Sequence, residues 1–173
     1  MKEHKGMRPQ DVVVLLKIVA LGGQHWYNKD LANQLDISKS EVSESLNRSL
    51  VGGLLEEDKK TVRREALFQF LVHGLKHVFP AIPGRLQRGL PTAYSAPVLS
   101  GEFVVDDPYI WPAPGLPNTV KGISISPLYA TVPQACAEDA ALYELLALAD
   151  ALRVVEWQSD VAELLRSKMF GEE

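Results

Sequence analysis

Proline is confined to the middle of this chain, and that distribution limits where helices can form. Of the 11 prolines, Pro9 alone precedes residue 80, and the others lie between Pro80 and Pro133. Because proline lacks a backbone N–H and clashes with the preceding helical turn, it favours turns and extended chain. We therefore predict a mainly α protein with a small β component, divided into a helical unit, residues 1–79, and a proline-rich, irregular α+β unit, residues 80–173.

The first expected helix begins at Pro9, because a missing N–H has no consequence in a first helical turn. It ends at Gly22 and Gly23, which are typical of a helix stop. The residues between are apolar on more than one face, so this helix should lie at the centre of a core or an interface. A second, short helix over residues 29–35 can be capped by Asn28.

Ser38 and Glu41 have the S-x-x-E spacing of a capping box, which predicts a third helix that extends to about Gly52. Residues 54–62 carry two short apolar runs around a polar turn and predict a small hairpin. A longer helix over residues 64–79 should follow, because proline ends it at the next position.

The second unit begins with residues 80–118, which we expect to hold little regular structure while packing on a core. Residues 120–126 alternate in polarity and predict a strand, so the unit should hold one or two strands. Two helices, over residues 138–155 and 161–170, should close it. Residues 134–173 carry a formal charge of −6 within a net charge of −4, so these acidic helices with broad apolar faces suggest a protein–protein surface.

A set of mainly apolar residues is spaced across the second and third expected helices and the start of the hairpin. It comprises Leu31, Ala32, Leu35, Ile37, Ser40, Val42, Ser43, Leu46, Leu50, Gly53, Leu54 and Leu55. With this spacing the segment LANQLDISKSEVSESLNRSLVGGLLEED resembles the DNA-binding core of MarR-like winged-helix regulators, over roughly residues 9–78. The resemblance implies an N-terminal winged helix-turn-helix that binds double-stranded DNA and regulates transcription.

The third helix should place Val42 and Leu46 inward and hydrogen-bonding side chains outward. In a docked helix-turn-helix such a helix enters the major groove, where Asn47 can bind adenine, Arg48 guanine and Glu44 cytosine. Cations on the hairpin and polar groups at the helix starts would meet the phosphates. The candidate DNA-binding residues are Asn28, Lys29, Ser38, Lys39, Ser40, Ser43, Glu44, Asn47, Arg48, Lys59, Lys60 and Arg63.

Three acidic residues modify this expectation. Glu44 and Glu41 place carboxylates on a helix that must approach phosphates, which lowers nonspecific affinity. Asp36 stands in the turn, where helix-turn-helix proteins usually have glycine, and aspartate tolerates the left-handed conformation. We therefore expect weak, salt-sensitive binding by a monomer and useful affinity from a homodimer with two recognition helices.

A winged helix does not fix the function. The alternative is a protein-interaction module, such as an antitoxin-like protein that masks a partner with its acidic C-terminal helices and binds DNA incidentally. The two hypotheses make different demands on the chain, because a regulator needs Asn47 and Arg48, whereas a masking module needs the leucine-rich C-terminal helices.

The sequence favours neither an enzyme nor a metalloprotein, and we expect no cofactor. It has no G-x-x-x-x-G-K-S/T, no G-x-G-x-x-G after a strand and no G-x-S-x-G. His73 and His77 have metal-binding spacing, but no third ligand is identifiable, so we interpret them as helix-surface histidines. The lone Cys136 fits a reducing compartment and the N-terminal residues lack a signal-peptide pattern, so we expect a cytoplasmic protein without a membrane span.

Overall fold

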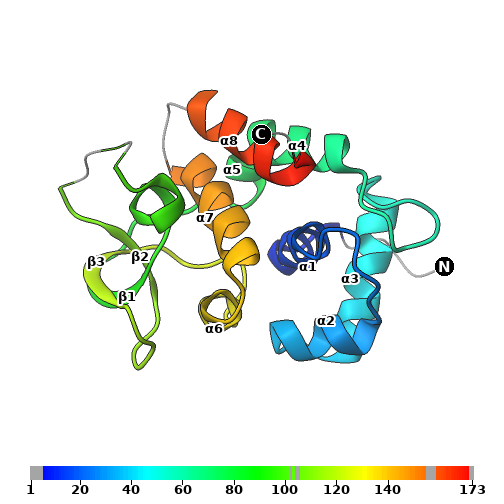
Figure 1. The fold of residues 1–173 in the computed structure, drawn as a ribbon, viewed down its shortest axis with the longest axis horizontal. Coiled ribbons are helices and arrows are strands. Elements are labelled where there is room, and N and C mark those ends of the chain that lie inside the picture. The colour runs from blue at the N-terminus through cyan, green and yellow to red at the C-terminus, as the bar shows by residue number, and fades with distance from the viewer. Residues whose placement is uncertain (1–5, 102, 104–105, 155–158, 172–173) are drawn as a thin grey trace.

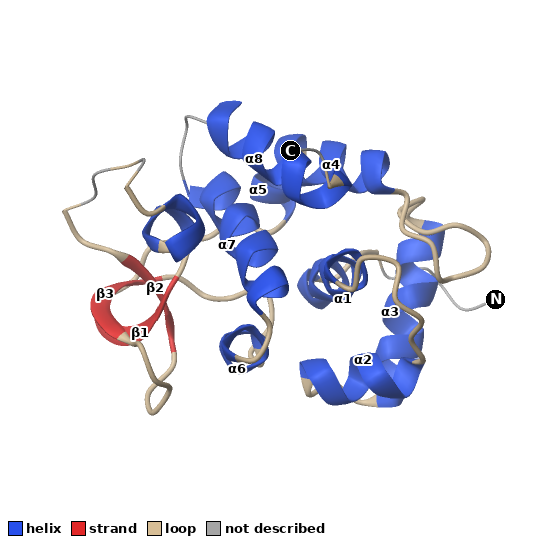
Figure 2. Cartoon of the chain, in the orientation of Figure 1, coloured by secondary structure: helices blue, strands red, loops and turns tan. Residues whose placement is uncertain are grey.

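A computed structural model describes residues 6–101, 103, 106–154 and 159–171. The architecture is mainly α with a small β component, which confirms the predicted fold class, and the strands lie together at one end of the molecule (Figures 1 and 2). The helices are α1 (Pro9–Ala20), α2 (Asn28–Leu35), α3 (Lys39–Val51), α4 (Arg64–His73), α5 (Leu75–Val78), α6 (Val132–Ala137), α7 (Ala140–Val154) and α8 (Ser159–Phe170). The strands are β1 (Leu86–Pro91), β2 (Tyr109–Pro112) and β3 (Val120–Ser124).

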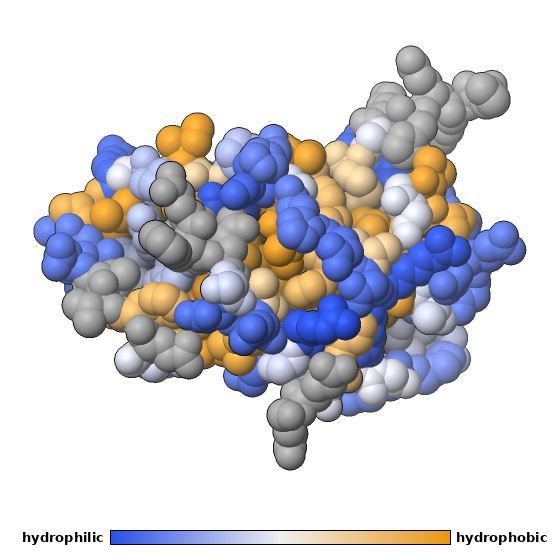
Figure 3. Space-filling view, turned by 90° about the horizontal axis from the view of Figure 1, so that it is seen from above, coloured by the Kyte–Doolittle hydropathy of each residue, from blue (hydrophilic) through white to orange (hydrophobic). Residues whose placement is uncertain are grey.

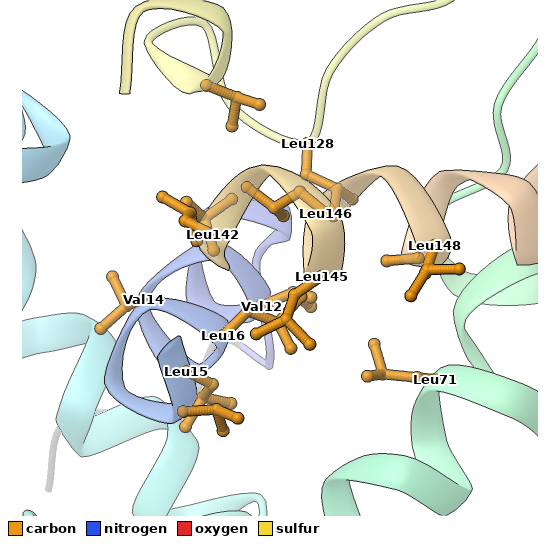
Figure 4. Close-up of a cluster of buried hydrophobic side chains, with 14 of the residues drawn as sticks. Val12, Val14, Leu15, Leu16, Leu71, Leu128, Leu142, Leu145, Leu146 and Leu148 are labelled. Atoms are coloured by element: carbon orange, nitrogen blue, oxygen red, sulfur yellow. The ribbon is translucent and has the colours of Figure 1, made fainter. Parts of the chain in front are cut away.

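Helix α1 is buried on all sides, as its apolar sequence predicts. Every residue from Asp11 to Val19 is buried, and the helix lies between α3 and α7. In Figure 4, Val12 and Leu16 lie close to Leu145 of α7. Because the same hydrophobic core includes residues from both sides of residue 80, α1 joins the two parts of the chain.

Helices α2 and α3 are joined by a turn that depends on Asp36. This residue has φ 51° and ψ 50°, which confirms that an aspartate takes the left-handed turn position here. The predicted cap of α2 is wrong, because Asn28 is already inside the helix. The Asp30 carboxylate instead accepts a hydrogen bond from the backbone N–H of Tyr27, at 2.8 Å, and so closes the first turn.

The helix predicted over residues 64–79 is interrupted. It divides at Gly74 into α4 and α5, and Gly74 has φ −110° and ψ −37°, outside the usual helical range. A Cβ atom there would lie 2.9 Å from the Phe70 ring, so a larger residue at this break would require the Phe70 side chain to shift. Glycine is also a poor helix former, and this low helix propensity is the local reason why the helix divides at Gly74.

The three strands form a small closed sheet, and the prediction of little regular structure in residues 80–118 is therefore wrong. Strand β1 is antiparallel to β2 and to β3, and β2 and β3 are parallel. Pro91 and Pro112 are the last residues of their strands, where a missing N–H disturbs the ladder least. The predicted strand over residues 120–126 is confirmed as β3.

Near the C-terminus, the two predicted helices are confirmed as α7 and α8, and one short helix, α6, was not predicted. Its Pro133 lies in the first turn, where proline is tolerated. Residues 155–158 lie outside the described part of the chain. Helix α8 packs on α4 and α7, and Phe170 contacts Phe68 edge to face. The division into units at residue 80 stays a prediction.

A buried carboxylate fastens the sheet to α7. Asp150 accepts hydrogen bonds from Trp111 Nε1 at 2.5 Å, Thr92 Oγ1 at 3.1 Å and the Arg153 guanidinium at 2.6 Å. Burial raises the pKa of Asp150, although the charge and hydrogen bonds of these partners act in the opposite direction. Arg153 also donates to the carbonyl oxygens of Phe79, which precedes β1, and of Ser126, which follows β3. The cluster therefore joins α7 to the segments that enter and leave the sheet.

The surface above α4 and α8 mixes hydrophobic and hydrophilic residues (Figure 3). Among the residues that the structure describes, none of the helices combines the length and the apolar character that a bilayer crossing requires.

The tight sheet makes a prediction about glycine. A Cβ atom at Gly122 would lie 2.1 Å from the carbonyl oxygen of Pro108, so Gly122→Ala forces the backbones of β3 and the chain before β2 apart. We expect a loss of unfolding free energy of about 1–3 kcal/mol, measured by urea denaturation. Lys121→Ala, at the neighbouring exposed position, is the control. Equal denaturation midpoints for the two variants would contradict this account.

Candidate nucleic-acid interface

The outer side of α3 is the clearest candidate for a binding surface. Lys39, Ser40, Ser43 and Glu44 are exposed, and Asn47 is half-buried. Val42 and Leu46 lie on the inner side, against the core, as predicted. The helix lies at the opposite end of the molecule from the sheet (Figure 1), so this surface is well separated from the second half of the chain.

The start of α3 contains half of the predicted capping box. The backbone N–H of Glu41 donates to Ser38 Oγ at 3.1 Å, and Ser38 Oγ also lies 3.1 Å from Ser40 Oγ. The Glu41 carboxylate does not serve the cap, because it accepts hydrogen bonds from Arg48 and from Gln10 instead. Ser38 alone therefore caps the helix through its side chain.

Arg48 does not lie on the outer side, and its predicted role in reading DNA is wrong. Its exposed fraction is 8%, and Asp11, its partner on α1, is fully buried. The guanidinium donates from Nε and from one terminal nitrogen to the two oxygens of Asp11, at 2.9 and 2.7 Å. A third hydrogen bond from the guanidinium reaches Glu41 at 2.6 Å. Because a buried carboxylate needs a charged partner, Asp11 holds Arg48 against α1.

The charges of this cluster stabilise one another. Hydrogen bonds to Asp11 and then to Glu41 raise the pKa of Arg48 above its ordinary value, against the effect of burial. Burial by itself would raise the pKa of Glu41, but the bonds from Arg48 and Gln10 lower it below the usual value for glutamate. Arg8 adds a longer ion pair to Glu41, at 3.7 Å. The cluster fixes the orientation of α3 on α1.

The predicted hairpin is present as a single antiparallel bridge between Leu55 and Val62. Asp58 holds its turn, because the Thr61 hydroxyl and the backbone N–H groups of Lys60 and Thr61 all donate to its carboxylate. These hydrogen bonds lower the pKa of Asp58. Lys59 has φ 53°, a left-handed conformation that turns the chain at the tip.

The three predicted hairpin cations each have a partner within the chain. Lys59 Nζ donates to Asn47 Oδ1 at 2.7 Å, which joins the hairpin to α3. Lys60 Nζ donates to the backbone oxygen of Trp26 at 2.9 Å, and it lies 4.0 Å from the centroid of the Trp26 ring. Arg63 pairs with Glu56 at 3.1 Å, with both side chains about half exposed.

The residues at the start of α2 lie beside this surface. Lys29 is exposed, with its ammonium 5.7 Å from the centroid of the Tyr27 ring, whereas Asn28 is half-buried. Tyr27 is 57% exposed, and sequence reasoning did not separate it from the core aromatics. Its position directly before a capped helix is a signal that could have found it.

Of the predicted DNA-binding residues, the structure thus brings together those on the outer side of α3 and Lys59. Lys29, Lys60 and Arg63 lie at the margins of this surface, and Arg48 is buried and is not part of it. The exposed acids Glu44, Glu57 and Asp58 lie on the same two elements. Because these carboxylates offset the lysines, the surface has little excess positive charge, and specific hydrogen bonds would have to supply more of any affinity for DNA.

His73 and His77 are both exposed, and they lie on different helices because of the break at Gly74. Among the residues that the structure describes, no group of three His, Cys, Asp or Glu side chains is arranged to hold a metal ion. Comparisons of the chain with models of protein families, with curated proteins and with solved structures find no match.

The buried ion pair predicts a large effect of Arg48→Met. Removal of the guanidinium leaves the carboxylate of Asp11 buried without its cation, so we expect a loss of about 3–5 kcal/mol of unfolding free energy, measured by urea denaturation. The double variant Asp11→Leu, Arg48→Met should recover most of this loss. Arg63→Met removes an exposed pair and should cost less than about 1 kcal/mol. A small loss for Arg48→Met, with no coupling to Asp11, would show that the pair is unimportant.

The lowered pKa of Glu41 predicts a pH dependence. Since the folded state favours the ionised carboxylate, its contribution to stability is present above the unfolded pKa, about 4.3, and is lost as the pH falls through the lower folded pKa. The difference in unfolding free energy between the wild type and Glu41→Gln should therefore be largest at neutral pH and should shrink below about pH 4.3. Glu163→Gln, at an exposed position on α8, is the control and should show no such trend.

Proposed function

We propose that the chain is a sequence-specific, DNA-binding transcriptional regulator, and that residues 1–79 act as a winged helix-turn-helix whose reading helix is α3. The observation that carries this proposal is the outer side of α3. Its hydrogen-bonding residues Lys39, Ser40, Ser43, Glu44 and Asn47 point away from the core, while the inner side fixes the helix on α1 and α2. The resemblance to MarR-like regulators, given above, supports the same interpretation.

With Arg48 buried, base reading falls to Ser43, Glu44 and Asn47. Glutamate can accept a hydrogen bond from the cytosine amino group, and asparagine can bind adenine with both of its amide atoms. Lysine has only donors, so the partner of Lys59 on Asn47 is the amide oxygen, and the Asn47 amino group stays available as a donor. Lys59 would move to a phosphate when Asn47 engages a base.

A homodimer suits this function. One reading helix with two carboxylates nearby binds weakly, whereas two helices that meet half-sites one turn of DNA apart combine their affinities. The second half of the chain would supply the dimer contact or hold an effector or partner, and we propose the cytoplasm as the location.

A partner-masking interaction module is the second candidate, and the charge of the surface favours it. Four of the predicted DNA-binding cations, Arg48, Lys59, Lys60 and Arg63, are bound within the chain, while Glu44 and Glu57 are exposed. Such a surface fits a protein partner as well as it fits phosphates. In this case DNA binding would be incidental, and helices α7 and α8 would make the main contact.

One experiment distinguishes the regulator from the partner-masking module. It measures the fluorescence anisotropy of duplexes from the gene's own upstream region as the protein is added, across a salt series. The variant Lys39→Ala, Asn47→Ala should bind its preferred duplex at least tenfold more weakly, because a lost base contact is worth about 1–3 kcal/mol. The loss of Lys39 should also reduce the salt slope by about one. These two side chains point outward, so the variant should fold normally.

The matched control is Lys121→Ala, which removes the same charge from the exposed end of the molecule that carries β3. It should bind as the wild type does. Equal binding of preferred and unrelated duplexes, or equal affinity of the wild type and the double variant, would contradict the regulator and leave the masking module.

A further inference from the structure

The middle of the outer side of α3 offers hydrogen-bond acceptors rather than cations. The two cations of the helix are Lys39, its first residue, and Arg48, which is turned inward and 8% exposed. Of its two acids, Glu41 is bound to Arg48, whereas Glu44 is exposed. An ionised carboxylate can only accept hydrogen bonds. Within α3, all of whose residues the structure describes, Glu44 therefore gives the outer side an acceptor that no cation of the helix neutralises.

Glu44 and Asn47 form a pair on this side. They are three positions apart, which places them on one side of the helix and about 4.5 Å apart along its axis. Successive base pairs of B-DNA are spaced by about 3.4 Å, so the two side chains suit neighbouring base pairs. The Asn47 side chain is already ordered, because its amide oxygen accepts a hydrogen bond from Lys59 at 2.7 Å.

This pair suits bases that present an amino group in the major groove. Cytosine presents its N4 amino group there, and adenine presents its N6 amino group beside the acceptor N7. Glutamate accepts from the first, and asparagine binds both atoms of the second. Guanine presents only the acceptors N7 and O6, which a carboxylate repels. Arginine is a common reader of guanine, but Arg48 is bound to Asp11.

A single methyl group on either amino nitrogen removes the contact. Each nitrogen carries two hydrogens, of which one pairs with the opposite base and the other points into the major groove. A methyl group that leaves the base pair intact takes the place of the groove-side hydrogen, so the donor is lost. The carboxylate or amide oxygen then gives up its water without gaining a partner, which is costly.

We propose that α3 recognises the amino groups of a cytosine and an adenine on neighbouring base pairs, through Glu44 and Asn47, and that methylation of either nitrogen releases the protein from its DNA site. The proposal rests on the proposed function, because it requires α3 to lie in the major groove. It adds the kind of DNA site that the chain selects and a means of control, in which the modification state of the DNA sets the affinity.

Methylated duplexes test the proposal. A preferred duplex is first selected from a random library with the full-length protein, and each half-site should hold a C·G pair next to an A·T pair. Fluorescence anisotropy then compares this duplex unmethylated, N4-methylated at that cytosine and N6-methylated at that adenine. We expect each methyl group to weaken binding about tenfold or more, since a hydrogen bond is lost and its acceptor is left unpaired. The control is 5-methylcytosine, which keeps its amino group and should bind nearly as well as cytosine.

The outcomes separate the DNA chemistry from the function on which it rests. If no duplex is preferred, the regulator is wrong and this proposal is wrong with it. If one duplex is preferred but N4 and N6 methylation leave its affinity unchanged, or if its half-sites lack the C·G pair next to the A·T pair, the regulator stands and this proposal is overturned.

Variants assign each methyl group to a side chain. Glu44→Ala should no longer distinguish N4-methylcytosine from cytosine but should still respond to N6-methyladenine, and Asn47→Ala should show the opposite pattern. Glu57→Ala removes an exposed carboxylate from the hairpin, and as the matched control it should respond to both methyl groups. Low salt keeps the binding of the variants measurable through phosphate contacts, and a ratio of two affinities is insensitive to a fraction of unfolded protein. Wild-type ratios in both α3 variants would overturn the assignment.

Discussion

The rest of the structure depends on the burial of α1 together with two of its charges. A helix that is buried all round can carry Asp11 and Lys17 only if partners neutralise them. Asp11 is satisfied by Arg48 of α3, and Lys17 pairs at 2.5 Å with Asp139, which in turn accepts the N–H of Leu142 in α7. The two pairs set α3 on one side of α1 and α7 on the other, so α3 and the second half of the chain are both positioned by α1.

Local signals explain what the sequence could predict. Helices α1 and α3, and the left-handed turn at Asp36, follow from Pro9, Ser38 and the spacing of apolar residues, all of which act within a few positions. The strands β1 and β2 were missed because their hydrogen bonds join residues about twenty or more positions apart, and only their prolines were visible locally. In the candidate site, the exposed α3 residues were predictable from helical periodicity.

The orientation of Arg48 was not predictable from helical periodicity, since it depends on Asp11, 37 positions away. Asp11 is a lone carboxylate among the apolar residues of α1, and this pattern indicated that a cation from elsewhere in the chain must be buried beside it. The same reasoning applies to the hairpin, where Lys59, Lys60 and Arg63 look like free cations in the sequence but are bound to Asn47, Trp26 and Glu56. A ligand that displaces one of these contacts gains only the difference between the new interaction and the one that it replaces.

The packing of α8 on α4 bears on how the chain acquires its structure during synthesis. Leu67, Phe68 and Leu71 form the buried side of α4, and α8, which packs on α4 and contacts Phe68 through Phe170, is made about ninety residues later. A ribosome adds roughly 5–20 residues each second, so this apolar strip stays uncovered for several seconds while the sheet and α7 emerge. During that interval the nascent chain presents a hydrophobic helix to its surroundings, which makes it a natural client for chaperones until α8 arrives.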